Sequence, residues 1–437
     1  MVSLRCSNQL LLLLDATGER KVSMIARKFW ANTVGLIIVG LVFVCAVIVT
    51  GLNLRDESTV KPMVSTKELV ERGRYLALVG NCAGCHTLPG NEPYSGGYGV
   101  PTPYGVIYAG NLTPHKEQGI GTWNNDDFWR ALHNGRSKDG RLLYPAFPYT
   151  SYTKVTEQDS NALFAYLATL PPSARVSNPN TLQFPYNTQA ALAVWRALYF
   201  KPGVYVSADT ATNAKGEIDR GGYLVQGLGH CDACHAQRDR LGGVSDTKTL
   251  SGGIIPILNW YAPSLATSRI SNEVAIYLKV GKTDVYYASG PMAEVVFGST
   301  QFLTDRDAKA MQMYLANLPR HQEQSDSRAP ASSEVGARVY KDSCEGCHGK
   351  NGEGVKGAYP ALAANPAVLE HTPASLVRMI VEGGFGAATA SNPQPYGMPP
   401  YGQVLTPLQI AGVITHIRSS FGNKAGYVSE IEVIKYR

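Results

Sequence analysis

The sequence predicts a mainly α protein in which three small helical modules follow one another behind a single N-terminal transmembrane helix. Three observations lead to this prediction: a long uncharged apolar stretch, three copies of the motif C-x-x-C-H, and flanking segments that repeat with those motifs. The 437 residues suffice for two to four domains. The 44 glycines and 26 prolines indicate loop-rich globular modules rather than a coiled coil.

The charge distribution argues against nucleic acid as a partner. The formal net charge is +6, and residues 1–28 carry half of it, with five basic and two acidic side chains. The remaining chain has no run of Lys and Arg interleaved with aromatic residues, which a nucleic-acid surface would need.

Residues 29–54 form the apolar stretch and are long enough to cross a hydrocarbon core of about 30 Å. Basic side chains crowd its N-terminal side within residues 1–28, whereas an acidic pair follows Arg55. The positive-inside rule therefore keeps the N-terminus cytoplasmic and places the rest of the chain in the periplasm, anchored to the inner membrane. A cleaved signal peptide is the alternative, although the stretch is longer than a usual signal and lacks a clear A-x-A site.

Six of the eight cysteines lie in the three motifs, and the other two, Cys6 and Cys45, lie in the N-terminal segment. The motif residues are Cys82, Cys85 and His86; Cys231, Cys234 and His235; and Cys344, Cys347 and His348. No cysteine is left for a disulfide framework.

The motif C-x-x-C-H is the attachment signature of c-type haem. Two thiols one turn apart add to the haem vinyl groups, and the adjacent imidazole becomes the proximal iron ligand. A thioredoxin-like redox pair and a zinc site also use C-x-x-C. The His after every pair, and the lack of a second ligand pair at zinc spacing, favour three covalent haems.

The flanks of the motifs repeat as well. A short helical stretch precedes each motif and contains a glycine at which another helix could approach closely: Gly73, Gly221 and Gly336. A second helix, opening with a Thr suited to capping, closes each module within TEQDSNALFAYLATLPP, TDRDAKAMQMYLANLPR and TPLQIAGVITHIRSSFG. Two helices crossing over a buried haem make a small cytochrome c domain, so we expect three tandem cytochrome c domains.

These patterns divide the chain into segments with the following bounds. We expect a leader segment (1–28), the anchor (29–54), a first module (66–172), a linker (173–215), a second module (216–320), a third module (331–422) and a tail (423–437). The first linker contains an apolar helix candidate, 189–200, which either packs on a neighbouring module or contacts a partner subunit or the membrane. The second linker is polar.

The sixth iron ligand separates the three modules. A low-spin electron-transfer haem usually takes a Met from a loop before the last helix. Met292 and Met398 occupy such loops, 58 and 51 residues after Cys234 and Cys347. The first module has Phe147 there, 62 residues after Cys85, and no Met lies between Met63 and Met292.

Two spare histidines in the first module are weaker candidates for that ligand. His115 lies in a loop, and His133 lies on a helix whose counterpart in the second module carries Lys279, so we expect His133 to face water. Methionines 311, 313 and 379 lie on helices, where Met mostly serves packing. We expect His86 to have an empty or weakly occupied sixth site, with a nearby His as the alternative.

From about residue 66 to 422 the chain resembles the tri-haem cytochrome c subunits of membrane-bound bacterial dehydrogenases of the alcohol, gluconate, sorbitol and fructose type. The segments NLTPHKEQGIGTW, LYPAFPYTSY and ASGPMAEVVFGSTQFLT carry this resemblance beyond the haem motifs. It implies a subunit that takes electrons from a flavin, pyrroloquinoline quinone or molybdenum dehydrogenase and passes them to ubiquinone. The family has LYPAMPY in the first module, so Phe147 is a departure.

Electron transfer is therefore the expected role, with the redox chemistry held by haem and no substrate chemistry in the chain itself. Two alternatives remain. One is a stand-alone relay to a terminal oxidase. The other is a haem peroxidase or ligand-binding cytochrome that works at the first haem and needs a distal group near Phe147, for which His115 is the candidate.

Overall fold

The computed structural model describes residues 11–54, 60–205, 215–244, 249–267, 273–320, 328–329 and 331–437. Its contacts divide the chain into two compact units, Met1–Arg55 and Asp56–Arg437. The described part of the first unit consists of one helix, and the second unit holds all three C-x-x-C-H motifs.

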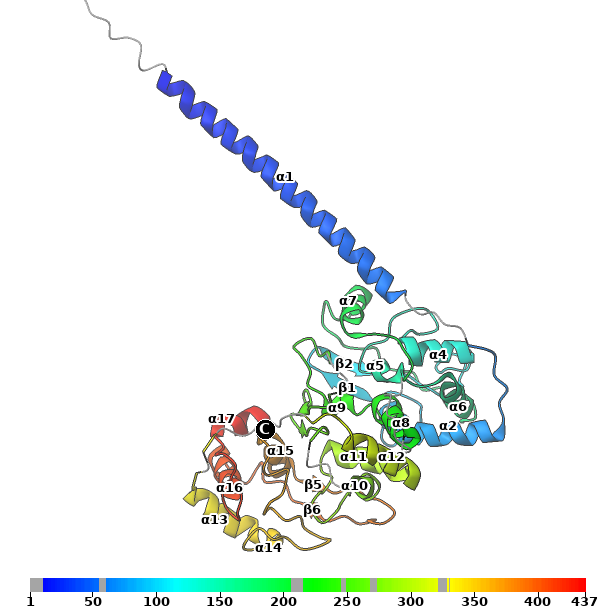
Figure 1. The fold of residues 1–437 in the computed structure, drawn as a ribbon, viewed down its shortest axis with the longest axis vertical. Coiled ribbons are helices and arrows are strands. Elements are labelled where there is room, and N and C mark those ends of the chain that lie inside the picture. Colours follow the sequence, from blue (N-terminus) through cyan, green and yellow to red (C-terminus); the bar gives the residue numbers. More distant parts are fainter. Residues whose placement is uncertain are drawn as a thin grey trace, which may run out of the picture. The chain divides into compact units, whose positions relative to one another are not determined.

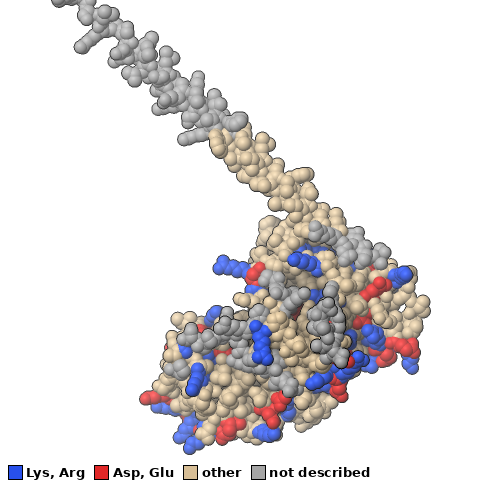
Figure 2. Space-filling view, in the orientation of Figure 1, with Lys and Arg blue, Asp and Glu red and all other residues tan. Residues whose placement is uncertain are grey.

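Helix α1 (Leu11–Asn53) is continuous and begins well before the apolar stretch predicted from the sequence (Figure 1). Its 22 residues from Asn32 to Asn53 are apolar and long enough to cross a membrane, judged by length and composition. Figure 2 shows that the described side chains of this helix include no charged group, in contrast to the second unit, where both signs are interspersed over the visible face.

The second unit is mainly helical, as predicted, and each module contributes one short antiparallel hairpin. The first module contains α2 (Lys67–Val79), α3 (Cys82–His86), β1 (Gly99–Thr102), β2 (Gly105–Tyr108), α4 (Asn125–Asn134), α5 (Tyr149–Tyr152) and α6 (Glu157–Leu167). The linker helix is α7 (Gln189–Tyr199). The second module contains α8 (Lys215–Tyr223), the π-helix η1 (Leu224–Leu228), α9 (Asp232–His235), β3 (Gly253–Ile254), β4 (Tyr261–Ala262), α10 (Val274–Val280), α11 (Pro291–Gly298), the 3₁₀-helix η2 (Thr300–Phe302) and α12 (Asp305–Ala316). The third contains α13 (Glu334–Ser343), α14 (Glu345–His348), α15 (Ala374–Glu382), β5 (Gly384–Phe385), β6 (Gly397–Met398), α16 (Pro407–Ser419) and α17 (Glu430–Tyr436).

The same helix pair recurs three times, because α2 packs on α6, α8 on α12, and α13 on α16. Each pair crosses at the glycine singled out from the sequence. A Cβ atom added to Gly73 would lie 1.8 Å from the carbonyl oxygen of Ala162. A Cβ added to Gly221 would lie 2.0 Å from the carbonyl oxygen of Ala310, and one added to Gly336 would lie 2.0 Å from that of Gly412. These distances are far inside van der Waals contact, so only glycine allows the backbones to approach this closely.

The closing helix of each module begins as the sequence predicted. The side chain of the N-cap threonine accepts a backbone N–H three residues further on, at Thr156, Thr304 and Thr406. Each bond satisfies one of the N–H groups that the first turn of a helix leaves without a partner.

The first and second modules share one hydrophobic core, in which Leu76 and Leu163 pack in the same cluster as Leu224 and Leu315. In Figure 1 their helices α2, α6, α8 and α12 lie together. The third module has a separate core.

Reciprocal hydrogen bonds join the first two modules. The Tyr75 hydroxyl of α2 donates to Asp307 of α12 at 2.6 Å, and the Tyr223 hydroxyl of α8 donates to Asp159 of α6 at 2.6 Å. Each aspartate also pairs with the arginine that precedes the crossing glycine of its own module, Arg72 with Asp159 and Arg220 with Asp307. The two modules therefore exchange the same contact in both directions.

A one-residue insertion in the second module explains η1. Seven positions separate Tyr75 from Cys82, whereas eight separate Tyr223 from Cys231. The π-helix from Leu224 to Leu228 accommodates the extra residue, a common role of single π turns, so the second motif follows its helix without a break.

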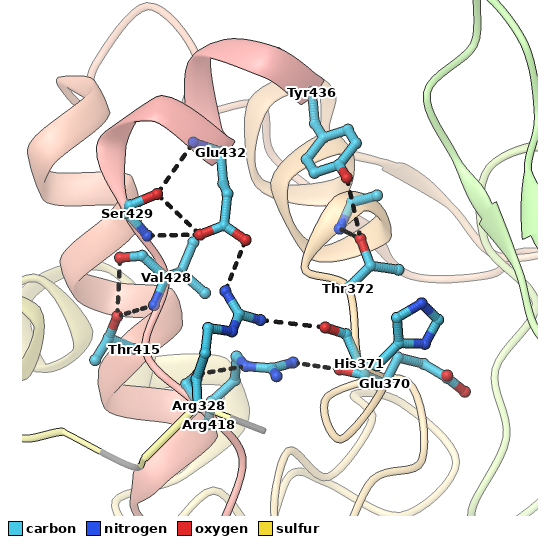
Figure 3. A network of polar contacts seen from close by, with 12 residues as sticks. Arg328, Glu370, His371, Thr372, Thr415, Arg418, Val428, Ser429, Glu432 and Tyr436 are labelled. Atoms are coloured by element: carbon cyan, nitrogen blue, oxygen red, sulfur yellow. Dashed lines mark hydrogen bonds and ion pairs between the residues drawn. The ribbon is translucent and has the colours of Figure 1, made fainter. Parts of the chain in front are cut away.

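Residues 423–437, expected to form a tail, pack onto the third module through α17, where Val433 is fully buried (Figure 3). Arg328 pairs with Glu432 at 2.6 Å and also donates to the His371 carbonyl. The buried Arg418 donates to the carbonyls of Val368, Glu370 and Gly426. These carbonyls satisfy a guanidinium that would be costly to bury alone.

The linker helix α7 packs on its neighbours through one face. Arg196 is buried against the ring of Tyr149, and the Trp195 indole donates to the Leu241 carbonyl at 3.0 Å. Val194 and Leu198 remain exposed on the other face. Most of the polar second linker, residues 321–327 and 330, lies outside the described residues.

Candidate haem sites

The three motif histidines have the same hydrogen bond. Nδ1 of His86 lies 2.7 Å from the Gly110 carbonyl, that of His235 lies 2.7 Å from the Pro263 carbonyl, and that of His348 lies 2.9 Å from the Pro360 carbonyl. A ring nitrogen facing a carbonyl must carry the proton, so Nε2 keeps its lone pair for a metal.

The imidazoles are also held in the neutral form. Burial lowers the pKa of His86, His235 and His348, although the carbonyl bonds act in the opposite direction. A neutral imidazole is the form that ligates iron.

The first thiol of each motif is protonated rather than ionised. Burial raises the pKa of Cys82 and Cys231 to about 12 and that of Cys344 to about 11. A redox-active C-x-x-C pair depends on a thiolate, which burial of these thiols disfavours. Within the described ranges, no three His, Cys, Asp or Glu side chains cluster as a metal site on their own.

The surroundings of the motifs fit haem. Several apolar side chains that pack on the core are only partly buried, such as Leu112 and Trp123 in the first module and Leu265 and Tyr277 in the second. Leu265 and Tyr277 line one cavity together with Cys231 and His235. A flat apolar group placed there would cover them, which is how a haem completes a small core.

A continuous cavity of about 920 Å³ contains the second and third sites. Its lining includes the motif residues Cys231, Cys234 and His235 together with Met292, and the motif residues Cys344, Cys347 and His348 together with Met398. The structure thus brings each predicted methionine into the same cavity as its predicted histidine. Met311 and Met379 also line the cavity from their helices.

The first site differs in its aromatic side chains. Phe147 packs against the shared core, and its ring centroid lies 5.2 Å from that of Tyr152. Tyr152 is buried, and its pKa is raised by this burial and by the nearby thiols Cys82 and Cys85. Phe147 and Tyr152 therefore stand close to the first motif.

The prediction that His133 faces water is wrong. Its side chain is 3% exposed, and its ring lies flat on Trp129 one turn earlier, with centroids 4.3 Å apart. Helix α4 turns this face toward the body of its own module, whereas Lys279 at the matching position in the second module pairs with Asp305 near the surface.

Two side chains that the sequence analysis missed join the first and second sites. Asn81 and His230 each immediately precede the first cysteine of a motif. Asn81 and His230 both line the cavity of the second module, and the His230 ring meets the Tyr152 ring of the first module edge-on. Each of these two side chains thus contacts the neighbouring module. The sequence could not predict these contacts, because they depend on how the two modules pack against each other.

The carbonyls that orient the histidines were also missed, because a backbone oxygen has no signature of its own. One sequence feature could have indicated them. Each residue that supplies such a carbonyl, Gly110, Pro263 or Pro360, is followed two positions later by a leucine that packs on the core, namely Leu112, Leu265 and Leu362. That leucine anchors the loop on the core beside the imidazole.

Comparison with known proteins agrees with this geometry. The profile of the cytochrome c family matches residues 70–171 and 333–421. The cytochrome c subunit of the quinone alcohol dehydrogenase of Gluconacetobacter polyoxogenes is 37% identical over 84% of both chains. The gluconate 2-dehydrogenase cytochrome c subunit of Pantoea cypripedii is 36% identical, over 82% of this chain and 86% of its own. The fructose dehydrogenase cytochrome subunit of Gluconobacter japonicus is 32% identical, over 89% and 87%. The chain belongs to this family of dehydrogenase cytochrome c subunits.

Proposed function

We propose that the chain carries three covalent haem c groups and relays electrons from a dehydrogenase catalytic subunit to ubiquinone. The observation that supports this most strongly is the threefold repetition of one arrangement. Each motif follows a glycine-crossed helix, and each motif histidine donates Nδ1–H to a loop carbonyl. Such an arrangement prepares a ligand for iron, and the bound haem supplies the redox chemistry.

The residues divide into attachment and ligation. Cys82, Cys85, Cys231, Cys234, Cys344 and Cys347 would hold the three haems through thioether bonds. His86, His235 and His348 would be the proximal ligands, and Met292 and Met398 the sixth ligands in the second and third sites. A thioether opposite an imidazole raises the reduction potential, which suits acceptance of electrons.

Two observations support a relay between the sites. The second and third share one cavity. The first and second approach through their thiols, since the charge of Cys85 contributes to raising the pKa of Cys234. In such an electron carrier the protein sets the spacing of the redox centres and shields them from solvent.

The partners follow from the family. The relatives are named as subunits of alcohol, gluconate and fructose dehydrogenases, so a flavin, pyrroloquinoline quinone or molybdenum subunit would be the electron donor. The apolar part of α1 would anchor the chain in the inner membrane, near ubiquinone, with the haem unit in the periplasm.

Two measurements on the full chain, matured in a host with the haem-attachment machinery, test this proposal. Haem per chain, measured as the pyridine adduct and by intact mass, should be three. The isolated chain should be inert toward alcohols, sugars and aldehydes, and should become reduced when its partner dehydrogenase and substrate are added. Fewer than three haems, or substrate-dependent reduction of the chain alone, would contradict it.

A further inference from the structure

The first haem site lacks the methionine that the other two possess. Met292 lies twelve residues before the capping Thr304, and Met398 lies eight residues before the capping Thr406. Phe147 lies nine residues before the capping Thr156. Residues 66–172, all of which the structure describes, contain no methionine. The phenyl ring of Phe147 has no lone pair to give to iron.

His115 of the first module is not prepared to replace it. Its Nδ1 accepts the Gln118 backbone N–H at 3.2 Å and lies 3.3 Å from a carboxylate oxygen of Glu117. If the ring is neutral, Nδ1 accepts the Gln118 N–H and the proton therefore lies on Nε2. If the ring is charged and pairs with Glu117, both nitrogens carry protons, so Nε2 is protonated in either state. This is the reverse of the motif histidines, whose Nδ1 carries the proton and leaves Nε2 free.

His133 is held by a neighbour on its own helix. Its buried ring lies against the Trp129 indole with an angle of 11° between the planes. Turning it toward an iron would break this stack and expose the face of the tryptophan, which is itself buried.

His230 comes from the second module and lies at the border of the first site. Its ring meets that of Tyr152 edge-on, with centroids 5.5 Å apart. His230 and its counterpart Asn81 both line the cavity of the second and third sites, where Met292 is an axial candidate. We therefore assign neither of them as the axial ligand of the first haem.

We propose that the first haem has no protein side chain at its sixth position and binds neutral diatomic ligands such as carbon monoxide. This inference rests on the proposed covalent haems. Small uncharged ligands suit the site because the side chains beside the motif are the apolar ring of Phe147 and the buried ring of Tyr152. The polarity and access of the distal pocket decide what a haem binds.

The test uses the full-length chain after its haem content has been measured. The dithionite-reduced protein is titrated with carbon monoxide and the Soret band is recorded. One carbon monoxide should bind per chain, so that one third of the haem absorbance shifts. The oxidised protein should show the sulfur-to-iron charge-transfer band of two His/Met haems.

Three variants locate the binding. Phe147→Met should abolish carbon monoxide binding and increase the charge-transfer band by about half, because a third thioether would join two. Phe147→Leu, an apolar change without a ligand atom, should keep carbon monoxide binding. His230→Asn, which copies the residue found before Cys82, should also leave the binding stoichiometry at one.

Failure of this inference is distinguishable from failure of the proposed function. Three haems per chain with no carbon monoxide binding would overturn the open site and leave the relay intact. Binding of one carbon monoxide in His230→Asn but none in the wild type would identify His230 as the ligand of the first haem and would equally overturn it. Fewer than three haems would instead contradict the proposed function.

Discussion

The first two modules and the third are built from the same helix pair, yet the first two are fused and the third stands apart. The difference depends on two positions. The first two modules have a tyrosine two residues after the crossing glycine, Tyr75 or Tyr223, and an aspartate three residues after the capping threonine. The third has Arg338 and Gln409 at these positions. It therefore lacks both halves of the reciprocal Tyr–Asp contact.

The third module is joined to the second by other hydrogen bonds and by one small apolar cluster, in which Ala387 packs with Ala288, Ala293 and Val296. Ser375 bonds both the N–H and the carbonyl of Tyr261, at 3.1 Å each. Lys282 donates to the Gly357 carbonyl and to Asn392 at 2.9 Å each. The large core of the third module nevertheless remains separate from the core of the first two. We therefore expect two unfolding transitions, one for the first and second modules together and one for the third.

Substitution of a crossing glycine should have the largest effect. Gly221→Ala places a Cβ 2.0 Å from a backbone oxygen, which no side-chain rotation relieves, and should cost about 3 kcal/mol or more. It should lower the midpoint of the transition shared by the first two modules, whereas Gly336→Ala should lower only that of the third. Differential scanning calorimetry measures both. Gly216→Ala, which meets no atom within 4 Å, is the matched control.

Removal of one reciprocal hydroxyl should have a smaller effect. Tyr223→Phe leaves Asp159 without a buried donor and the Thr156 N–H without its acceptor, at a cost of about 2 kcal/mol. Chemical denaturation should show the loss in the shared transition. Tyr340→Phe removes a hydroxyl bonded within the third module and should move the other transition. Equal shifts of both transitions in Tyr223→Phe would contradict the separation of the cores.

Loosening the junction of the third module should cost about 1 kcal/mol, the value of an ordinary hydrogen bond. Ser375→Ala removes both bonds to Tyr261 and should increase the susceptibility of the junction loops to limited proteolysis. The stability of the first two modules should stay unchanged. Ser299→Ala is the contrasting variant, because its hydroxyl bonds the Val79 carbonyl within the fused pair. It should lower the shared transition without increasing proteolysis of those loops.

Acidification should have the smallest effect. Burial raises the pKa of Asp307, but bonds from Arg220 and Tyr75 outweigh it and lower the pKa overall. A carboxyl group whose pKa is lower in the folded than in the unfolded protein stabilises the fold at a pH above its unfolded pKa, which is near 4. This stabilisation is lost as the pH falls through the pKa of the folded protein. The shared transition should therefore weaken below about pH 4, and less so in Asp307→Asn. Asp305→Asn, at an exposed position, should keep the wild-type pH dependence.

The elements that follow from local rules could be predicted from the sequence alone. Spacing within C-x-x-C-H marks the attachment residues, the glycine at each helix crossing is required by backbone contact, and threonine caps the closing helices. It also indicated Met292 and Met398, because both precede those helices in the chain, although the structure places them in α11 and β6 rather than in loops. Each of these signals needs only residues close together in the chain.

Only the tertiary structure decided how the modules combine. Tyr75 meets Asp307 across 232 positions, and His230 reaches Gly80, because two similar modules pack face to face. The burial of His133 likewise depends on which way α4 turns. Contacts of this kind depend on the relative orientation of segments far apart in the chain, and no local propensity or spacing encodes that orientation.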